Sequence, residues 1–395
     1  MKLKKIILIT YADDFILNEA KQLVLSIPEY EILKVFTQKY FNRAKYGIGT
    51  GKAEEIKEFL QEIKEVEEII VDEHLSFKQI YNLEKLLEVT VKDRERLILD
   101  IFYTRATTVE AKLQIQLAEI KYEMPKVKEN AKLLSSSKGR TGKGGMGEYI
   151  VDVHFRDLKR QMTYIKEKLN DAKIKRNMYQ RKRQKLGMPV VSLVGYTSSG
   201  KTTLFNLLTN ESKETSSNLF TTLSTTTRSF KNSHNNKNNN PKARGEREIL
   251  IVDTVGFISR LPTYMIDAFK STLEESLSAN MILLLIDSSE EIQDIKRKYS
   301  NCLRILEELD VDKSKLFTVL TKVDKIETRM IDEIITNLRA NNNDSDNDSD
   351  NDSDTSNIIY ISAKTGYGIH KFKTLLKMMK KQFVETEYGK INVKT

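Results

Sequence analysis

The first hundred residues alternate between short apolar runs and amphipathic stretches. Mostly apolar runs, typical of buried strands, occur at 6–10, 69–72 and 97–100. Apolar residues at helical spacing occur at 18–26, which Pro28 closes, and at 77–87. This alternation predicts an N-terminal α/β domain with a largely parallel sheet, which we place at residues 1–105.

A glycine-rich loop, Gly47-Ile48-Gly49-Thr50-Gly51-Lys52, lies inside this domain. It is similar to a phosphate loop, but its glycine spacing is one residue short and Ala53 stands where a metal-binding hydroxyl is needed. We interpret it as a turn that begins a helix over 53–63. Contact with RNA phosphate is the alternative.

The pattern changes over 106–187, where two long apolar stripes at helical spacing predict an antiparallel helical hairpin. The first stripe consists of Val109, Leu113, Leu117, Ile120 and Met124. The second consists of Leu158, Met162, Ile165, Leu169 and Ala172. Pro125 is expected to interrupt or kink the first helix.

The second hairpin helix is strongly basic, and the whole chain carries a net charge of +9. A solvated helix face is the simplest explanation of a charge run. Here the excess of one sign favours contact with a nucleic-acid backbone. The tip between the helices, 135–148, is basic and rich in glycine. It is either a plain connector or a loop that becomes ordered on RNA.

A third domain, expected at 188–383, opens with the strand-like run 190–194. The residues after it fit the G-x-x-x-x-G-K-[ST] loop, whose backbone N–H groups surround phosphates. They are Gly195, Tyr196, Thr197, Ser198, Ser199, Gly200, Lys201 and Thr202. Lys201 is expected to reach the β- and γ-phosphates, and the Thr202 hydroxyl to bind Mg²⁺.

Two segments that follow have the order found in nucleotide switches. The first consists of Phe220, Thr221, Thr222, Leu223 and Ser224. A hydroxyl from this segment is expected to complete Mg²⁺ coordination when the γ-phosphate is present. The neighbouring threonines at 225–227 leave the choice of ligand open. The second follows a strand at 249–252 and consists of Asp253, Thr254, Val255 and Gly256. Asp253 is expected beside Mg²⁺, and the Gly256 N–H at the γ-phosphate.

Base recognition is expected after three further strands, at 281–287, 316–320 and 358–361. Thr321, Lys322, Val323 and Asp324 follow the second of them. The Asp324 carboxylate accepts two hydrogen bonds from the N1–H and amine of guanine, a donor pair that adenine lacks. Asn is usual where Thr321 stands, and we expect weaker support of the loop there. Ser362, Ala363 and Lys364 follow the last strand and are expected to receive guanine O6.

Low-complexity inserts at 232–247 and 341–357 and a tail at 384–395 complete the predicted organisation. The single cysteine, Cys302, excludes an intrachain disulfide framework. The apolar run at 6–9 is too short for a signal peptide, and no run is long enough to span a membrane. We therefore expect a cytoplasmic monomer.

Taken together, these residues resemble the HflX family of translational GTPases over nearly the whole chain. The resemblance rests on 93–102 with Arg105-Ala106 and Thr108, on 144–148, on the phosphate loop, on 219–223, and on 253–258 with Leu261-Pro262. It implies an α/β domain, a helical hairpin and a GTPase domain. It also implies binding to the large ribosomal subunit and ribosomal RNA, and dissociation or rescue of stalled ribosomes.

The same resemblance makes Thr202 and Thr222 the Mg²⁺ ligands, and Lys201, Thr222 and Gly256 the catalytic candidates. The family often has Asn where Ser198 stands, a position linked to a monovalent cation, so potassium dependence stays open. Phe257 stands where Ras-like enzymes have a water-orienting glutamine. The attacking water must then be positioned by backbone, cation or partner, which predicts slow hydrolysis that ribosomes accelerate.

Three other functions compete with this prediction. The first is an RNA-binding module in which GTP gates docking and hydrolysis is incidental. The second is a GTPase that serves RNA modification, for which the chain offers no catalytic cysteine motif or added enzyme domain. The third is an ATPase, which conflicts with Asp324.

Overall fold

The computed structural model describes residues 3–41, 45–137, 146–212, 225–231, 248–267, 278–343 and 358–379. The chain forms two compact units. The first consists of Met1–Ala172 together with Pro262–Ala268, and the second of Lys173–Leu261 and Phe269–Thr395. The division into three domains that the sequence predicts stays a proposal. Among the described helices, none is long and apolar enough to cross a membrane.

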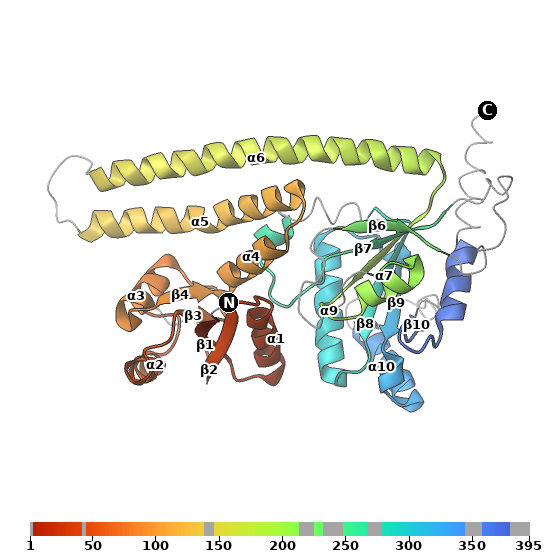
Figure 1. Cartoon of the computed structure of the whole chain (residues 1–395), viewed down its shortest axis with the longest axis horizontal. Coiled ribbons are helices and arrows are strands. Elements are labelled where there is room, and N and C mark those ends of the chain that lie inside the picture. The colour runs from red at the N-terminus through yellow and green to blue at the C-terminus, as the bar shows by residue number, and fades with distance from the viewer. Residues whose placement is uncertain are drawn as a thin grey trace. The chain divides into compact units, whose positions relative to one another are not determined.

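The first unit contains a four-stranded parallel sheet in the order β2-β1-β3-β4. Its strands are β1 (Lys4–Tyr11), β2 (Tyr30–Gln38), β3 (Glu68–Val71) and β4 (Thr90–Asp93). Its helices are α1 (Asp14–Leu25), α2 (Thr50–Glu62), α3 (Phe77–Leu87) and α4 (Arg94–Arg105), as Figure 1 shows. The predicted α/β class and parallel sheet are confirmed.

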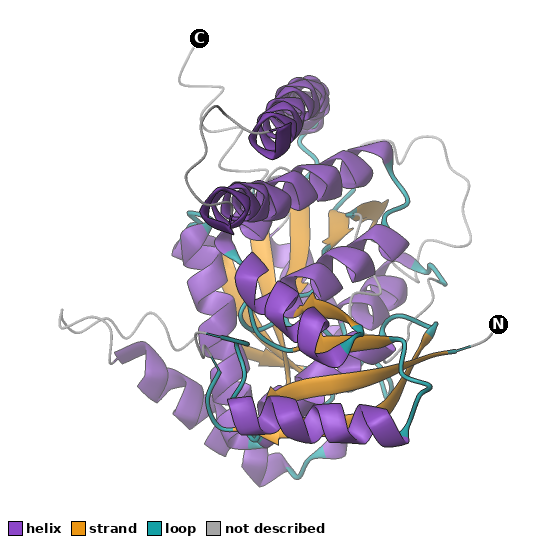
Figure 2. Cartoon of the chain, turned by 90° about the vertical axis from the view of Figure 1, so that its left-hand side faces the viewer, coloured by secondary structure: helices purple, strands orange, loops and turns teal. Residues whose placement is uncertain are grey.

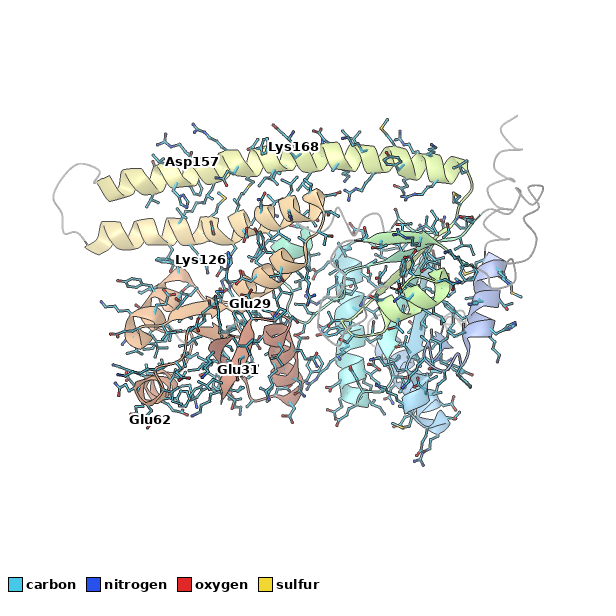
Figure 3. All side chains as sticks on the ribbon, viewed as in Figure 1. Glu29, Glu31, Glu62, Lys126, Asp157 and Lys168 are labelled. Atoms are coloured by element: carbon cyan, nitrogen blue, oxygen red, sulfur yellow. The ribbon has the colours of Figure 1, made fainter. Side chains whose placement is uncertain are left out.

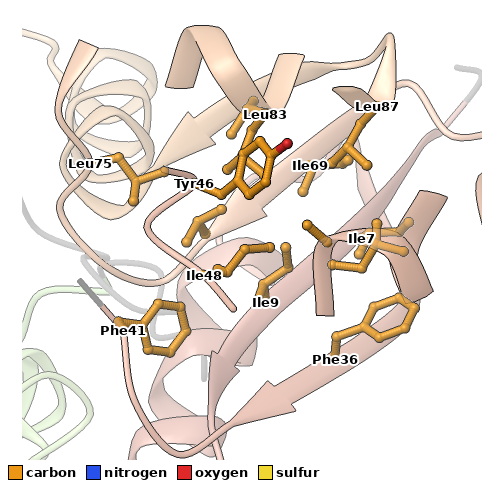
Figure 4. Packing of buried hydrophobic residues seen from close by; sticks show 14 of the residues in the cluster. Ile7, Ile9, Phe36, Phe41, Tyr46, Ile48, Ile69, Leu75, Leu83 and Leu87 are labelled. Atoms are coloured by element: carbon orange, nitrogen blue, oxygen red, sulfur yellow. The ribbon is translucent and has the colours of Figure 1, made fainter. Parts of the chain in front are cut away.

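One face of this sheet packs on a cluster of buried aliphatic and aromatic side chains, shown in Figure 4. Ile7 and Ile9 of β1 and Ile69 of β3 lie at its centre and are fully buried. Gly47 enters the cluster with φ +73°, and a Cβ on it would lie 2.2 Å from Leu75 Cδ2. The glycine is thus required for the turn that leads into α2, as the sequence interpretation proposed.

One prediction for this unit was wrong, and two of its strands were not predicted. Residues 97–100 belong to helix α4 and not to a strand. Leu97, Ile98 and Leu99 are all buried, so the run shows no helical periodicity. The Asp93 carboxylate accepts a hydrogen bond from the Arg96 N–H at 2.9 Å and starts the helix. Strand β2 was not predicted because exposed polar residues interrupt its apolar ones, and strand β4 was not predicted because it has only four residues, of which one is apolar.

Helices α5 (Val109–Ser137) and α6 (Met146–Lys185) form the predicted hairpin, and they run side by side in Figures 1 and 2. Leu117 and Ile120 of α5 pack with Leu158 and Ile165 of α6. Figure 3 shows Asp157 and Lys168 on the side of α6 that faces away from α5. The tip residues 138–145 lie outside the described part of the chain.

Helix α5 continues through Pro125, so of the two expected effects, interruption or a kink, the interruption is wrong. Proline removes one helical hydrogen bond and crowds the preceding turn. Side chains next to it anchor the helix instead. Tyr122 donates a hydrogen bond to Asp93 Oδ1 at 2.8 Å, and Lys126 lies 3.5 Å from Asp93 Oδ2.

The second unit contains a six-stranded sheet in the order β10-β9-β8-β5-β7-β6. Its strands are β5 (Val190–Gly195), β6 (Thr226–Ser229), β7 (Leu250–Asp253), β8 (Met281–Asp287), β9 (Leu316–Thr321) and β10 (Ile358–Tyr360). The edge strand β6 is antiparallel to β7, and the other printed pairs are parallel. Its helices include α7 (Lys201–Thr209), α9 (Ile292–Glu308) and α10 (Thr328–Asn343), with short 3₁₀ turns η2 (Lys313–Lys315) and η3 (Val323–Lys325), and residues 369–379 form a further helix.

A buried ionic cluster closes the carboxyl end of the first sheet, between β1 and β3. Ligands often bind in an open parallel sheet at such a point, where the strand order reverses. Here Arg94 fills it, only 3% exposed, and pairs with Glu19 at 2.6 Å and with Asp72. Thr10 donates a further hydrogen bond to Asp72 at 2.8 Å. The crevice is therefore occupied by the chain itself.

The variant Arg94→Met should lower the free energy of unfolding by about 3–5 kcal/mol, because it leaves two carboxylates buried without their cation. Chemical denaturation followed by circular dichroism measures this. The matched control is Arg96→Met, whose side chain is 32% exposed beside Asp100 and Glu119. It should cost about 1 kcal/mol or less. Equal losses in the two variants would contradict the assigned role of the buried cluster.

Candidate functional site

The phosphate loop joins β5 to α7 and contains two glycines that no other residue can replace without strain. Gly195 has φ +146°, and a Cβ there would lie 2.4 Å from Leu285 O. Gly200, at φ +89°, caps the N-terminus of α7. The loop therefore passes close to β8 and then turns its backbone into the start of a helix, an arrangement suited to anions.

Lys201 lies inside this loop. Its Nζ donates hydrogen bonds to Gly195 O at 3.1 Å and to Tyr196 O at 2.7 Å, so the side chain folds back beneath the loop backbone. Burial lowers the pKa of Lys201 to about 8, and the Asp253 carboxylate opposes that effect only in part. The buried ammonium group of Lys201 thus lacks a full negative counter-charge, which a phosphate group would supply.

An oxygen pair suited to a divalent cation lies beside the lysine. Thr202 Oγ1 lies 3.2 Å from Asp253 Oδ2, and Asp253 is fully buried at the end of β7. Hydroxyl and carboxylate oxygens are donors that Mg²⁺ accepts, with phosphate and water oxygens for the rest. The donor set therefore fits the expected ion.

Gly256 lies directly against the phosphate loop. A Cβ on it would lie 2.8 Å from Thr197 Cγ2 and 3.0 Å from Lys201 Nζ. Thr254, two residues earlier, is fully buried and donates a hydrogen bond to Leu193 O at 2.8 Å. Val255 between them is 9% exposed. These contacts fix the segment 253–256 beside Lys201, where the sequence expected it.

The loops that the sequence predicts for base recognition also meet. Thr321 Oγ1 lies 2.8 Å from Ser199 O and 3.1 Å from Ile286 O, so its single proton ties β9 to the phosphate loop. The Ser362 hydroxyl lowers the pKa of Asp324, whose carboxylate is almost fully exposed. Val323 N donates to Ile361 O at 3.4 Å. The structure thereby brings Thr321, Asp324 and Ser362 to one edge of the sheet.

The remaining members of these loops are placed as follows. Ser198 has φ +62° in the phosphate loop, and Ser199 is buried. Lys322 has φ +58° and pairs with Asp287. Ala363 is half-buried and Lys364 is exposed. Phe220, Thr221, Thr222, Leu223 and Ser224 lie outside the described residues. Thr226 and Thr227 form part of β6, opposite Asp253 and Val252.

Sequence reasoning missed how residues after Gly256 attach to the phosphate loop. Thr197 N donates to Phe257 O at 2.8 Å, and Phe257 N donates to Gly195 O at 3.0 Å. Ser259 N donates to the Tyr196 hydroxyl at 2.7 Å. Backbone pairing of this kind leaves no residue pattern. The aromatic residue at the second loop position was the only available signal.

Comparisons with known proteins agree with this geometry. The family described as "GTP-binding GTPase N-terminal" matches residues 15–103, "GTP-binding GTPase Middle Region" matches 105–183, and "50S ribosome-binding GTPase" matches 190–325. The protein "GTPase HflX" of Methanocaldococcus jannaschii is 40% identical over 309 residues, which are 78% of this chain and 73% of that protein. The chain belongs to the GTPase HflX family.

Other HflX relatives give the same result. "GTPase HflX" of Thermococcus kodakarensis is 39% identical over 77% of this chain, and the match spans 66% of that relative's length. The Caldanaerobacter subterraneus protein is 35% identical over 95% of this chain and 79% of its own. A crystal structure of SsGBP with GDP has TM-score 0.53 at 25% identity, covering 96% of this chain and 99% of that one. The predicted family, enzyme class and α/β GTPase fold are confirmed.

Nucleotide affinity should fall as pH rises through the pKa of Lys201. Phosphate binding requires the ammonium form and raises its pKa, so above pH 8 the free protein must take up a proton to bind. With a free pKa near 8, affinity for GDP should drop about fourfold between pH 7 and 8.5. Calorimetry in two buffers of different ionisation enthalpy should show proton uptake at pH 8.5. Affinity and proton uptake that stay constant over this range would contradict the assignment.

The variant Asp324→Asn should exchange guanine preference for xanthine preference. A carboxylate accepts both the N1–H and the amine of guanine, whereas an amide offers one acceptor and one donor, which match the N1–H and O2 of xanthine. GTP affinity should fall by about tenfold or more for each hydrogen bond lost to a charged group. Titration with GTP, XTP and ATP measures this, with Asp332→Asn on α10 as control. Retained guanine preference would reject the role of Asp324.

Proposed function

We propose that this HflX-family chain binds Mg²⁺-GTP in the second unit and hydrolyses it to GDP and phosphate. The proposal is supported above all by the convergence of three loops, which brings Lys201, Thr202, Asp253 and Thr321 together with Asp324 along one edge of the sheet. Such an edge, at the carboxyl ends of parallel strands, is where open α/β sheets bind nucleotides.

Each residue has a proposed role in this site. Lys201 and the loop amides stabilise charge on the β- and γ-phosphates. Thr202 holds Mg²⁺ directly, and Thr222 is the second hydroxyl ligand. The buried carboxylate of Asp253 is the hydrogen-bond partner of Thr202. Gly256 offers its N–H to the γ-phosphate. Mg²⁺ supplies charge neutralisation between the phosphates when bound, and a monovalent cation near Ser198 is a further proposal.

The position after Gly256 makes the intrinsic reaction slow. Phe257 is 3% exposed and has no group that can orient or deprotonate water. Its own backbone is hydrogen-bonded to Gly195 and Thr197. A water that attacks the γ-phosphate must therefore be oriented by backbone groups or by a partner, and a partner that moves this segment would accelerate hydrolysis.

We propose that the partner is the large ribosomal subunit, which the hairpin contacts through ribosomal RNA. Exposed basic residues along α6 support this: Arg156, Lys159, Arg160, Lys166, Lys168, Lys173, Lys175, Arg181 and Lys182. Basic side chains in such excess bind phosphate backbones with a steep salt dependence. The chain would act as a monomer in the cytoplasm and dissociate or rescue stalled ribosomes. The free thiol of Cys302 is compatible with a reducing compartment.

Phosphate release should be slow for the protein alone and about tenfold or more faster with large subunits, as for GTPases whose catalysis a partner completes. Release is measured with and without purified subunits. Cosedimentation in GDP and in a non-hydrolysable GTP analogue gives binding in each state. If release is equal with and without subunits, activation is rejected.

Reversal of charge on α6 tests the RNA contact. Lys166→Glu/Lys168→Glu should weaken subunit binding and reduce its salt slope by about one for each lost phosphate contact. The matched control is Lys371→Glu, an exposed lysine of the second unit. Repeated subunit splitting in the analogue-bound state would favour the alternative function, an RNA-binding module in which hydrolysis is incidental.

A further inference from the structure

The chain that follows Gly256 is fastened at two places, and the first is the phosphate loop. Phe257 exchanges backbone hydrogen bonds with Gly195 and Thr197, at 3.0 and 2.8 Å. Ser259 N donates to the Tyr196 hydroxyl at 2.7 Å. Any group that enters beside Thr197 and Lys201 therefore acts directly on the segment 257–259.

The second place lies a few residues further along, within the first compact unit, which includes Pro262–Ala268. The Tyr264 hydroxyl donates a hydrogen bond to Glu95 Oε2 at 2.7 Å, and Met265 and Ile266 are buried. Asp267 lies 3.8 Å from Lys121 of α5. Burial and the Glu95 carboxylate raise the pKa of Tyr264, so its hydroxyl stays protonated and keeps donating.

Glu95 belongs to a polar cluster that reaches the hairpin. We define the Glu95 cluster as six side chains: Tyr264, Glu95, His74, Asp93, Tyr122 and Lys126. Glu95 Oε1 lies 3.1 Å from His74 Nδ1, which lies 4.0 Å from Asp93 Oδ2. Asp93 accepts a hydrogen bond from Tyr122 at 2.8 Å and lies 3.5 Å from Lys126. Figure 3 shows Lys126 between α5 and the sheet of this unit.

The cluster meets α5 at the turn that contains its proline. Pro125 lies between Tyr122 and Lys126, and proline cannot donate the hydrogen bond that would satisfy the carbonyl of Lys121. Helix bends concentrate at such a residue. Asp93 is fully buried and also caps α4, so the attachment of Tyr122 and Lys126 has little freedom to shift unless the cluster rearranges.

We propose that the Glu95 cluster couples the nucleotide site to the hairpin, with Tyr264 as the positioning residue. The proposal rests on the proposed binding of GTP. A γ-phosphate that takes the Gly256 N–H displaces Phe257 from the phosphate loop, and Tyr264 transmits this shift to Glu95 and so to the turn of α5 at Pro125. By linkage, a ligand that holds the hairpin changes the relative affinities for GTP and GDP by the same factor.

The test is hydrogen exchange of the full-length protein, saturated with GDP or with a non-hydrolysable GTP analogue. In the wild type, amides around 120–128 should exchange at rates that differ by about fivefold or more between the two states. Tyr264→Phe removes only the hydroxyl and should abolish that difference. The control is Tyr103→Phe on α4, whose side chain is 61% exposed and which should keep the full difference.

A second variant, Glu95→Gln, keeps an acceptor for Tyr264 but removes the charge that faces His74. It should reduce the difference in part, and the double variant should behave as Tyr264→Phe alone, because the two residues act in one path. A full difference in Tyr264→Phe, or none in a wild type that binds both nucleotides, overturns the coupling. Nucleotide titration of the same samples is the separate check. Failure to bind either nucleotide would overturn the proposed function, and the coupling with it.

Discussion

The shape of the phosphate loop in the second unit depends on one buried group, the ammonium of Lys201. Lys201 is 6% exposed, and its hydrogen bonds to Gly195 O and Tyr196 O hold the phosphate loop in its curved form. The loop must then contain a glycine at 195, where a Cβ would collide with the backbone of Leu285, and the neighbouring segment a glycine at 256, where a Cβ would crowd Thr197 and Lys201. A cation without a full counter-charge costs free energy in a buried site, and this cost favours anionic ligands over water.

Asp93 plays a comparable part in the first unit. Its carboxylate caps α4 through Arg96 N and accepts the Tyr122 hydroxyl from α5, while it is fully buried at the end of β4. Arg94, the next residue, turns to the opposite side and fills the crevice between β1 and β3. Two adjacent charged residues thus fix a strand end, a helix start and the base of the hairpin, and Arg94 occupies the crevice between β1 and β3.

Sequence patterns predicted the elements that bury only one face. They failed for elements that do not follow this pattern. The amphipathic run 77–87 coincides with α3, and the hairpin stripes with the packed residues Leu117, Ile120, Leu158 and Ile165. The run 97–100 predicts a strand because its three apolar residues are consecutive, whereas all three are buried within helix α4. In the site, the spacing of the motifs predicted which loop residues to expect. The attachment of Phe257 and Ser259 was not predicted, because it is made by backbone atoms that carry no residue signature. Tyr264 pairs with a residue far away in the sequence, which no local pattern reveals.

Thr321 shows why a departure from a common motif need not remove its function. Asparagine at this place would supply two donors and an acceptor, whereas threonine supplies one proton. That proton is shared between Ser199 O and Ile286 O, so the tie between the base-recognition strand and the phosphate loop persists with less redundancy. The buried hydroxyl of Ser362 restrains Asp324 from the other side and lowers the pKa of that carboxyl. The proposed guanine selection by Asp324 would therefore keep support from Thr321 on the side of the phosphate loop and from Ser362 on the other.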